Sequence, residues 1–382
     1  MKRKPLELET MLQEGYTRRF AKRYLTQLGK ENEMSCFDTE YRRWAHEYGF
    51  YVENASSYPL SPENIDYYLS DYDYYKVWPL NNWTRIWIND KLTIKYLLAD
   101  SPYGDIMPKY YFYTTKDSLV SLIDTGSKEG SIDNFVNVLR EVGEFACKPC
   151  NGTTAIGFFK LSYSEGCYFF NDNIITIDEI KDIISKHPNY IFTEYLRPDP
   201  YFKKISDQIH TLRIVTLNER GNTPIIVGGY LRFPTRYNGK ANYTVLDGDD
   251  VTRYNLFIDL DINNGHFYNA KRTFINRTEP TLRHPDSNEL LDGYIPNWQD
   301  VKEQILGIAQ RFNTLEWLGF DIGITENGIK CMEVNSHPGI KYMQIFKPLY
   351  DNEILAEYFE RKLCEIDNMT ENEKAKRNET LR

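Results

Sequence analysis

Three side chains that carry oxygen ligands lie close together near the end of the chain: Asp321, Glu333 and Asn335. They stand on two short, mostly apolar runs, and between these runs lies Asn327-Gly328, a pair typical of a β-hairpin turn. Hard oxygen ligands on one surface suit Mg²⁺, which takes few carboxylates and leaves room for substrate phosphates. The spacing fits equally well the polar outer face of an ordinary hairpin, so both interpretations stay open here.

The length of the turn decides whether Asp321 joins the other two ligands. A two-residue turn at Asn327-Gly328 would set Asp321 opposite Val334, on the wrong face. A three-residue loop at 326–328, with Gly328 left-handed, sets Asp321 opposite Glu333, and this is the loop that we expect. Because side chains alternate along a strand, the residues expected on the face of Glu333 and Asn335 include Cys331, and those on the other face are Met332 and Val334.

A second candidate for chemistry is Lys148, at the end of an apolar strand expected at 144–149. The loop after it, 150–157, is rich in small and hydroxyl residues, including Thr153 and Thr154. Backbone N–H groups and hydroxyls in such a loop can surround a phosphate. It is not a Walker loop, because the pattern G-x-x-x-x-G-K-[ST] is absent, and a plain hairpin loop is the alternative.

Arg213 is a third candidate, in the middle of a strand expected at 209–216. An unpaired charge there is costly, so Arg213 requires either a phosphate oxygen or an internal carboxylate as its partner. Upstream, a strand expected at 190–196 ends at the double-proline step 197–200, the strongest hinge or linker signal in the chain.

Composition excludes several classes of protein. The chain has 382 residues, 26% charged and 41% hydrophobic, which is ordinary for a globular protein of two or three packed units. A net charge of −9 argues against binding nucleic acid or an anionic membrane as the main function. No apolar run reaches membrane-spanning length, so we expect no membrane span and a cytoplasmic protein. Cys147 and Cys150 have C-x-x-C spacing, but no second pair accompanies them, so neither zinc nor redox chemistry is expected.

Periodicity and capping residues predict the elements that must position these side chains. Residues 1–88 are expected to be mostly helical, with helices at 6–28, at 36–48 and from Ser61. Further helices are expected at 89–98, 131–142, 177–187, 301–315 (capped by Asp300) and 354–366. Further strands are expected at 110–113, 158–161 and 223–233, and the distal part of the polar segment after 366 is expected to fray.

Five segments of the chain occur in a characteristic order: LNNWTRIWINDKLTIKYLL, FACKPCNGTTAIGFFKL, IHTLRIVTL, GGYLRFPT with ANYTVLDG behind it, and LGFDIGITENGIKCMEVNSHPGIKYMQ. This order resembles the ATP-grasp superfamily. In detail it is similar to the sugar-transfer-associated branch and to the teichuronopeptide-biosynthesis-like group. The resemblance covers residues 75–350, most of the chain.

The resemblance implies a nucleotide site with ATP and Mg²⁺ as cofactors. Its implied cofactor-binding residues are Lys91, Lys148, Thr153, Thr154, Glu194, Tyr195, Leu196 and Asp199. Its implied catalytic residues are Arg213, Arg232 and Asn242, and its implied Mg²⁺ ligands are Asp321, Glu333 and Asn335. Two alternatives stay open, since Lys91 also fits a solvated helix start and Asp199 a turn residue. His337 is expected to be exposed and is left out of the catalytic set.

The implied fold is α+β: an ATP-grasp fold in which two α+β lobes clasp the nucleotide, with a mainly helical N-terminal region. We expect an N-terminal region at 1–88, a nucleotide-covering lobe at 89–196, a metal lobe at 197–366 and a polar tail at 367–382. The chain departs from the resembled pattern in two places. Thr153, Thr154 and Ala155 stand where relatives carry more Gly, and residues 1–88 lack the α/β pattern that usually precedes the two lobes.

The resemblance implies an ATP- and Mg-dependent carboxylate–amine ligase that works through an acyl phosphate. Its substrates would be a small-molecule or saccharide carboxylate and an amine acceptor, for example a sugar acid and an amino acid in surface polysaccharide biosynthesis. One alternative is an ATP-grasp kinase that phosphorylates a hydroxyl or an amide, and another is a non-catalytic nucleotide-binding protein. The sequence assigns no oligomeric state.

Overall fold

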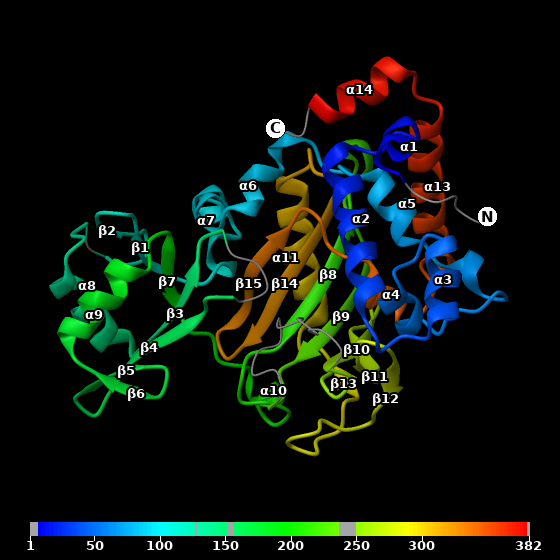
Figure 1. The fold of residues 1–382 in the computed structure, drawn as a ribbon. Coiled ribbons are helices and arrows are strands. Elements are labelled where there is room, and N and C mark those ends of the chain that lie inside the picture. Colours follow the sequence, from blue (N-terminus) through cyan, green and yellow to red (C-terminus); the bar gives the residue numbers. More distant parts are fainter. Residues whose placement is uncertain (1–6, 127, 152–155, 237–249, 380–382) are drawn as a thin grey trace.

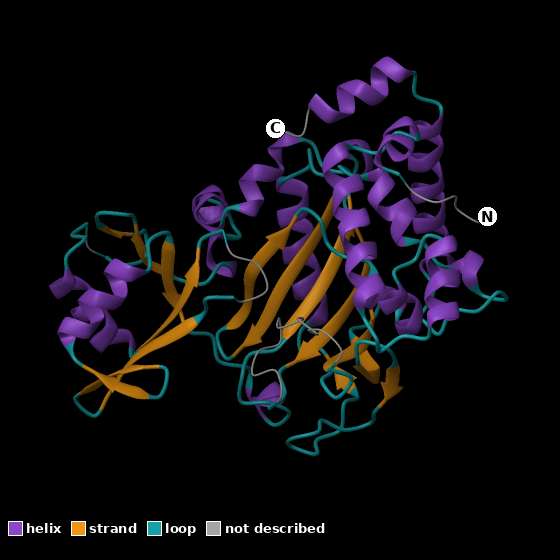
Figure 2. Ribbon diagram, in the orientation of Figure 1, coloured by secondary structure: helices purple, strands orange, loops and turns teal. Residues whose placement is uncertain are grey.

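Two antiparallel sheets form the body of the protein (Figures 1 and 2). The structure is a computed structural model that describes residues 7–126, 128–151, 156–236 and 250–379. The smaller sheet has seven strands in the order β2-β1-β7-β3-β4-β5-β6, and the larger has eight, in the order β12-β11-β10-β9-β8-β14-β15 with β13 paired to β11. Helices and antiparallel strands are thus both present, as the expected α+β class requires.

The smaller sheet occupies residues 110–194 and has helices on one face. Its strands are β1 (Tyr110–Thr114), β2 (Leu119–Ser121), β3 (Glu144–Pro149), β4 (Phe159–Ser164), β5 (Cys167–Phe170), β6 (Asn173–Ile175) and β7 (Tyr190–Glu194). The helices are α8 (Ile132–Val142) and α9 (Ile177–Lys186), which bury Phe135, Leu139 and Ile180 against Phe145 and Phe192 of the sheet. Ser131 caps the first helix, and a capping box of Thr176 and Glu179 starts the second.

The larger sheet carries its apolar core on one face. Its strands are β8 (Thr211–Leu217), β9 (Ile225–Phe233), β10 (Asn255–Asp261), β11 (His266–Thr273), β12 (Thr278–Pro280), β13 (Gly293–Tyr294), β14 (Trp317–Thr325) and β15 (Gly328–Asn335). Helix α11 (Trp298–Arg311) packs there, with Ile305 and Ile308 in one cluster with Ile214 and Phe320. Ile94 and Leu98 of α7 (Lys91–Ala99) join the same cluster, so α7 packs with the larger sheet. The expected domain boundary at residue 89, which assigns α7 to the nucleotide-covering lobe, stays a prediction.

Helices of the N-terminal region cover part of the opposite face, as Figure 1 shows. They are α1 (Leu8–Gln13), α2 (Arg18–Glu33), α3 (Thr39–Glu47), α4 (Val52–Ser57), α5 (Asp71–Val77) and α6 (Ile86–Asn89). Together with α13 (Glu353–Asp367), they bury Phe20, Val77 and Phe359 against Val215 and Trp317 of the sheet. The expected helical N-terminal region is therefore present, and the uncovered remainder of this face is free to form a site.

The remaining elements are short connections. They are α10 (Pro200–Lys203), α12 (Lys341–Gln344), α14 (Glu371–Glu379) and the 3₁₀ turns η1 (Ile65–Tyr67), η2 (Trp83–Arg85), η3 (Gly104–Ile106), η4 (Glu219–Gly221) and η5 (Leu349–Asp351). No helix in the described part of the chain combines the length and apolarity needed to cross a bilayer.

Four local expectations were wrong. The helix expected at 6–28 is broken at Gly15, whose φ of +93° ends α1. Ser61 starts no α-helix, because only the 3₁₀ turn η1 follows it. Helix α11 begins after Asn297, so Asp300 lies in its first turn instead of capping it. The tail does not fray at 371–379 but forms α14, where Arg377 donates hydrogen bonds to the carbonyl of Trp78 at 3.2 Å and to that of Gly15.

Candidate functional site

Four side chains form a row across the uncovered face of the larger sheet. Strand pairing sets Tyr230 opposite Arg213, Arg213 opposite Asp321, and Asp321 opposite Glu333. Side chains directly opposite each other in an antiparallel pair share a face, so the row runs unbroken from β9 through β8 and β14 to β15. Ile214 and Phe320, the neighbours of this row along the strands, point to the opposite face and are buried in the core.

The expected pairing of Asp321 with Glu333 is confirmed, but the expected loop is wrong. Thr325 pairs with Gly328, so the turn holds only two residues, and the register then shifts between Asp321 and Ile322. The shift places Met332 as an extra residue in β15, a β-bulge. Because a one-residue shift reverses the alternation, Cys331 pairs with Ile322 and is buried in the core, and Met332 faces the site.

Asp321 is the buried centre of the row and neutralises two arginines. Its side chain is 3% exposed; its Oδ1 lies 2.7 Å from Nε of Arg213 and 3.2 Å from Nη2 of Arg232. Nη2 of Arg213 also donates a hydrogen bond to Oδ2 at 3.0 Å. Burial lowers the pKa of Arg213, but the charges of Asp321, Tyr230 and Glu333 and the hydrogen bond to Asp321 together outweigh burial and raise the pKa above its ordinary value. Of the two partners left open for Arg213, the structure thus supplies the internal carboxylate.

Glu333 is held differently from Asp321. Burial is the main cause that raises the pKa of its carboxyl, and the charge of Asp321 adds to it. The nearest cation is Lys91, whose Nζ lies 3.9 Å from Oε1 of Glu333 and donates a hydrogen bond to the Cys150 carbonyl at 3.3 Å. Lys91 is buried, at 8% exposure, so the structure does not support a solvated helix start.

Lys148 is the second lysine near Glu333 that lines the cleft. In the described part of the chain, no hydrogen-bond or ion-pair partner meets its ammonium group. Burial and the neighbouring charge of Lys91 lower the pKa of Lys148 to about 8. A half-buried lysine with no direct ion-pair partner among the described residues marks a place for an anionic ligand.

These residues line one cleft of about 1260 Å³ between the two sheets. Its lining includes ten of the residues that the resemblance implies: Lys91, Lys148, Glu194, Tyr195, Leu196, Arg213, Arg232, Asp321, Glu333 and Asn335. Local sequence patterns did not point to several others that line it, among them Arg23, Lys160 and Arg197. Lys341 also lines it, and its place shortly after the metal strand was a signal for it. Tyr230 could have been found, because strand alternation places it on the face of Arg232.

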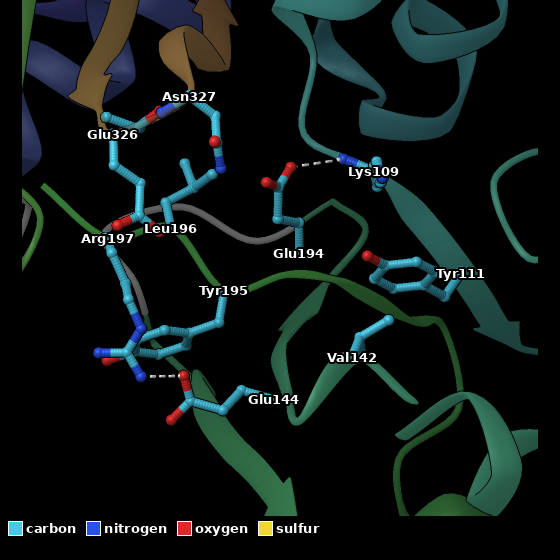
Figure 3. A pocket seen from close by; sticks show the side chains of 11 residues that line it. Lys109, Tyr111, Val142, Glu144, Glu194, Tyr195, Leu196, Arg197, Glu326 and Asn327 are labelled. Carbon is cyan, nitrogen blue, oxygen red and sulfur yellow. Dashed lines mark hydrogen bonds and ion pairs between the residues drawn. The ribbon is translucent and has the colours of Figure 1, made fainter. Parts of the chain in front are cut away.

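The end of β7 and the segment that follows it line both the cleft and a smaller pocket, which Figure 3 shows. The Glu194 carboxylate accepts a hydrogen bond from the Lys109 backbone N–H at 3.1 Å, and the ring of Tyr195 lies 5.5 Å from Nζ of Lys160. Arg197 forms an ion pair with Glu144, which Figure 3 shows beside Tyr195. Glu194, Tyr195 and Leu196 line this smaller pocket, which has a volume of about 290 Å³ and faces the hairpin turn.

Asp199 and His337 do not line the cleft. The Asp199 carboxylate caps α10 by accepting a hydrogen bond from the Tyr201 N–H at 2.8 Å, which favours the turn role. His337 packs against Trp78, with ring centroids 4.1 Å apart, and against Phe20, so the expectation of exposure was wrong. Burial, followed by nearby arginines, lowers the pKa of His337 to about 3. Thr153, Thr154 and Asn242 lie outside the described residues.

A comparison with protein families decides the family. The model described as sugar-transfer associated ATP-grasp matches residues 84–349, more than half of the 382 residues. The chain belongs to this ATP-grasp family. Membership gives the chain an ATP-grasp fold. Among curated proteins no sequence matches it.

Solved ATP-grasp structures resemble the chain only distantly. D-alanyl-alanine synthetase A from Vibrio cholerae is 16% identical with a TM-score of 0.40, over 73% of this chain and 66% of that one. N5-carboxyaminoimidazole synthetase from Staphylococcus aureus, complexed with ADP, is 12% identical with a TM-score of 0.38, over 70% and 50%. A RiPP-associated ATP-grasp ligase from Chryseobacterium gregarium, in complex with ADP and a peptide, is 12% identical with a TM-score of 0.34, over 72% and 60%. The chain spans about half to two thirds of the length of these proteins. A similarity this distant says nothing of the substrate of the chain.

The donor set of the ATP-grasp site fits Mg²⁺. Asp321 and Glu333 supply carboxylate oxygens and Asn335 an amide oxygen, which are hard ligands of the kind that Mg²⁺ takes. The Asp321 oxygens face donors of Arg213 and Arg232 and, at 3.4 Å, the side-chain amide N–H of Asn335. This amide would turn its oxygen toward a bound Mg²⁺, which would free a lone pair of Asp321 for the metal. Among the residues that the structure describes, no three His, Cys, Asp or Glu side chains gather as a metal cluster, so phosphate oxygens would complete the coordination.

Asp321 should be required for stability before any nucleotide binds. Asp321→Asn keeps the shape of the side chain but leaves two buried guanidinium groups without a counter-charge, so we expect the free energy of unfolding to fall by about 3–5 kcal/mol. Urea denaturation of the nucleotide-free protein measures this. Glu326→Gln, an exposed carboxylate in the turn of the same hairpin, is the matched control and should shift the free energy by less than about 0.5 kcal/mol. Equal stability of the two variants would contradict the role of Asp321.

Proposed function

We propose that this ATP-grasp protein is an Mg-dependent carboxylate–amine ligase that works through an acyl phosphate. The observation that carries the proposal is the arrangement of charge along one cleft, where Lys148, with no direct ion-pair partner among the described residues, lies near the row Glu333, Asp321 and Arg213. Cations without a local counter-charge suit the phosphates, and carboxylates beside them suit the metal that phosphates bring.

The nucleotide would span the cleft from the segment after β7 to the row. Glu194, Tyr195 and Leu196 lie where the two sheets meet, and we assign the adenine to them. Lys91 and Lys148 are assigned to the phosphates, because Nζ of Lys91 lies 3.9 Å from Glu333, and Lys148, on β3 of the smaller sheet, lines the same cleft. We also propose Thr153 and Thr154 as contacts of the phosphates and Asn242 as a contact of the reacting groups. Asp199 is left out of the site, because its side chain caps α10.

The reaction needs charge stabilisation more than proton transfer. A substrate carboxylate oxygen bonds to the terminal phosphorus of ATP, the bond from that phosphorus to ADP breaks, and an acyl phosphate forms. The amine nitrogen then bonds to the acyl carbon, the carbon–oxygen bond breaks, phosphate leaves, and the amine releases a proton. Arg213 and Arg232 lie beside Asp321, where they can hold the oxygens of the transferring group; Nε of Arg232 is buried and has no hydrogen-bond partner among the described residues. When bound, Mg²⁺ supplies further neutralisation of phosphate charge.

The acid and the amine that the enzyme would join are proposed by chemical class. The sugar-transfer association of the family supports a saccharide carboxylate as the acid and an amino acid as the amine, in the synthesis of a surface polysaccharide. A cytoplasmic location, where ATP is supplied, is part of the same proposal.

Lys148 should contribute to ATP affinity in a pH-dependent way. Lys148→Ala should weaken binding of a nonhydrolysable ATP analogue with Mg²⁺ at least about tenfold, or 1.4 kcal/mol, in calorimetry. Since bound phosphate favours the charged lysine, its pKa rises from about 8 on binding, so wild-type affinity should be steady below pH 8 and fall as the pH rises through 8. Lys148→Ala should lack this fall. Lys116 is exposed, and Lys116→Ala should bind the analogue as the wild type does. If Lys148→Ala binds the analogue as tightly as the wild type, Lys148 is not part of the site.

An acyl phosphate should be trapped by hydroxylamine. With ATP, Mg²⁺ and a panel of uronic acids, the wild-type enzyme should form a hydroxamate, detected by its iron complex or by mass. Glu333→Gln keeps the shape of the side chain and removes its charge, so it should lower hydroxamate formation at least a hundredfold, whereas Glu326→Gln in the nearby turn should leave it unchanged. ADP release together with a phosphorylated alcohol or amide, and no hydroxamate, would instead identify a kinase.

A further inference from the structure

The wall of the cleft that faces the larger sheet is built partly by the N-terminal helices. Arg23 of α2 lines the cleft, and so does Lys341, the first residue of α12. Lys341 is held by an ion pair with Glu53 of α4, a residue 288 positions away in the sequence. Two separate helices of the N-terminal region, α2 and α4, therefore help to place cations at the cleft.

Three arginines, Arg19, Arg23 and Arg85, gather near this part of the cleft. Arg19 and Arg23 stand four residues apart on α2, which places them on neighbouring turns of one helix face. Burial and the nearby Arg19 lower the pKa of Arg85, so the third arginine lies close to the first. None of the three forms an ion pair with a carboxylate in the described part of the chain. Of the three, Arg23 lines the cleft. In a chain with a net charge of −9, an arginine so placed and without a carboxylate partner among the described residues calls for an anionic ligand.

The position of Lys341 along the sheet separates this wall from the phosphate lysines. Lys91 approaches the row at Glu333, on the edge strand β15. Tyr342, the neighbour of Lys341, instead stacks on Phe257 of β10, with ring centroids 3.9 Å apart, and meets Tyr230 of β9 at 5.9 Å. Arg213 and Asp321 on β8 and β14 lie between these two ends, so the group transferred in the middle of the row would have ATP on one side and the other substrate on the β9–β10 side.

We propose that Arg23 and Lys341 form a subsite for an oxyanion, a carboxylate or a phosphate, carried by the amine substrate. This proposal rests on the ligase function above and names the acceptor class: an amine that bears an acidic group, such as an amino acid or an amino-sugar phosphate. Arg23 supplies a planar set of donors that matches either group, and the Lys341 ammonium has donors beyond the one that Glu53 occupies. Helices α2 and α4 thereby help to select the acceptor, although they lie before residues 84–349, the region that the family model matches.

The test compares a charged acceptor with a neutral one on the same acyl phosphate. Hydroxylamine, which carries no acid group, reports the acyl phosphate alone; glycine against glycinamide, and glucosamine 6-phosphate against glucosamine, report the acceptor subsite. The wild-type enzyme should prefer at least one charged amine to its neutral counterpart by tenfold or more in kcat/KM. Dependence on glycine would identify a carboxylate and dependence on glucosamine 6-phosphate a phosphate, and either result supports the subsite.

Arg23→Ala should lower the ratio of amide to hydroxamate at least tenfold for that amine, mainly through KM, and Arg23→Lys should restore part of it. The double variant Glu53→Gln/Lys341→Met, which leaves no unpaired charge behind, should lower the same ratio. Lys22→Ala, an exposed cation next to Arg23 that does not line the cleft, is the matched control and should leave the ratio unchanged.

Three results would overturn the proposal. The subsite is wrong if the wild type uses charged and neutral amines equally, and also if Arg23→Ala gives the same ratio as Lys22→Ala. Absence of hydroxamate from the wild type would mean that the ligase function itself has failed, and the subsite with it. Because hydroxamate is measured in every variant, the two kinds of failure are distinguishable.

Discussion

The Asp321 carboxylate, buried between Arg213 and Arg232, is the interaction on which the rest of the site depends. Three charges this close are stable in a buried place only when the geometry is fixed, and here three strands fix it. Gly319 contributes by having no side chain: a Cβ there would lie 2.8 Å from Nη1 of Arg213 and 2.6 Å from Cβ of Pro338. The protein thus holds two guanidinium groups at the centre of the cleft before any substrate arrives, which reduces the reorganisation that phosphoryl transfer requires.

Charge changes in a regular way along the cleft from this centre. Glu333 lies beyond Asp321 and has Lys91 as its nearest cation, whereas Lys148 has no such partner among the described residues. On the other side, Lys341 is balanced by Glu53, and Arg23 is not balanced by any carboxylate that the structure describes. The uncompensated cations therefore lie at two places, on either side of the arginine pair. A ligase that joins two anionic substrates through a phosphorylated intermediate accounts for both.

Local sequence rules predicted the parts of this arrangement that depend on local structure. Strand alternation placed Glu333 and Asn335 on one face, and Asp90 caps α7 as its position before an apolar helix indicated. The pairing of Asp321 with Glu333 was predicted correctly from an incorrect loop, because a two-residue turn followed by a bulge gives the same register as a three-residue loop. The same bulge reversed Cys331 and Met332, since one extra residue exchanges the faces of a strand.

Contacts between distant residues could not be predicted in this way. Nothing around Arg213 in the sequence shows that its partner stands 108 positions later, and nothing near Arg23 or Glu53 shows that α2 and α4 would meet the cleft. The tail is a similar case: its polar composition predicts fraying, yet Arg377 finds backbone carbonyls about 300 positions earlier in the chain. Such pairs depend on the packing of whole elements, and a single sequence carries no local signal for them.

The transfer of isotope from the acid to phosphate tests the central claim most directly. A carboxylate substrate labelled with ¹⁸O in both oxygens would be turned over with unlabelled ATP, Mg²⁺ and amine, and the released phosphate would be examined by mass spectrometry. If the acid is activated as an acyl phosphate, each phosphate should carry one ¹⁸O atom and the amide product should retain the other. Phosphate without label, at normal product yield, would show that the carboxylate is never phosphorylated and would contradict the account.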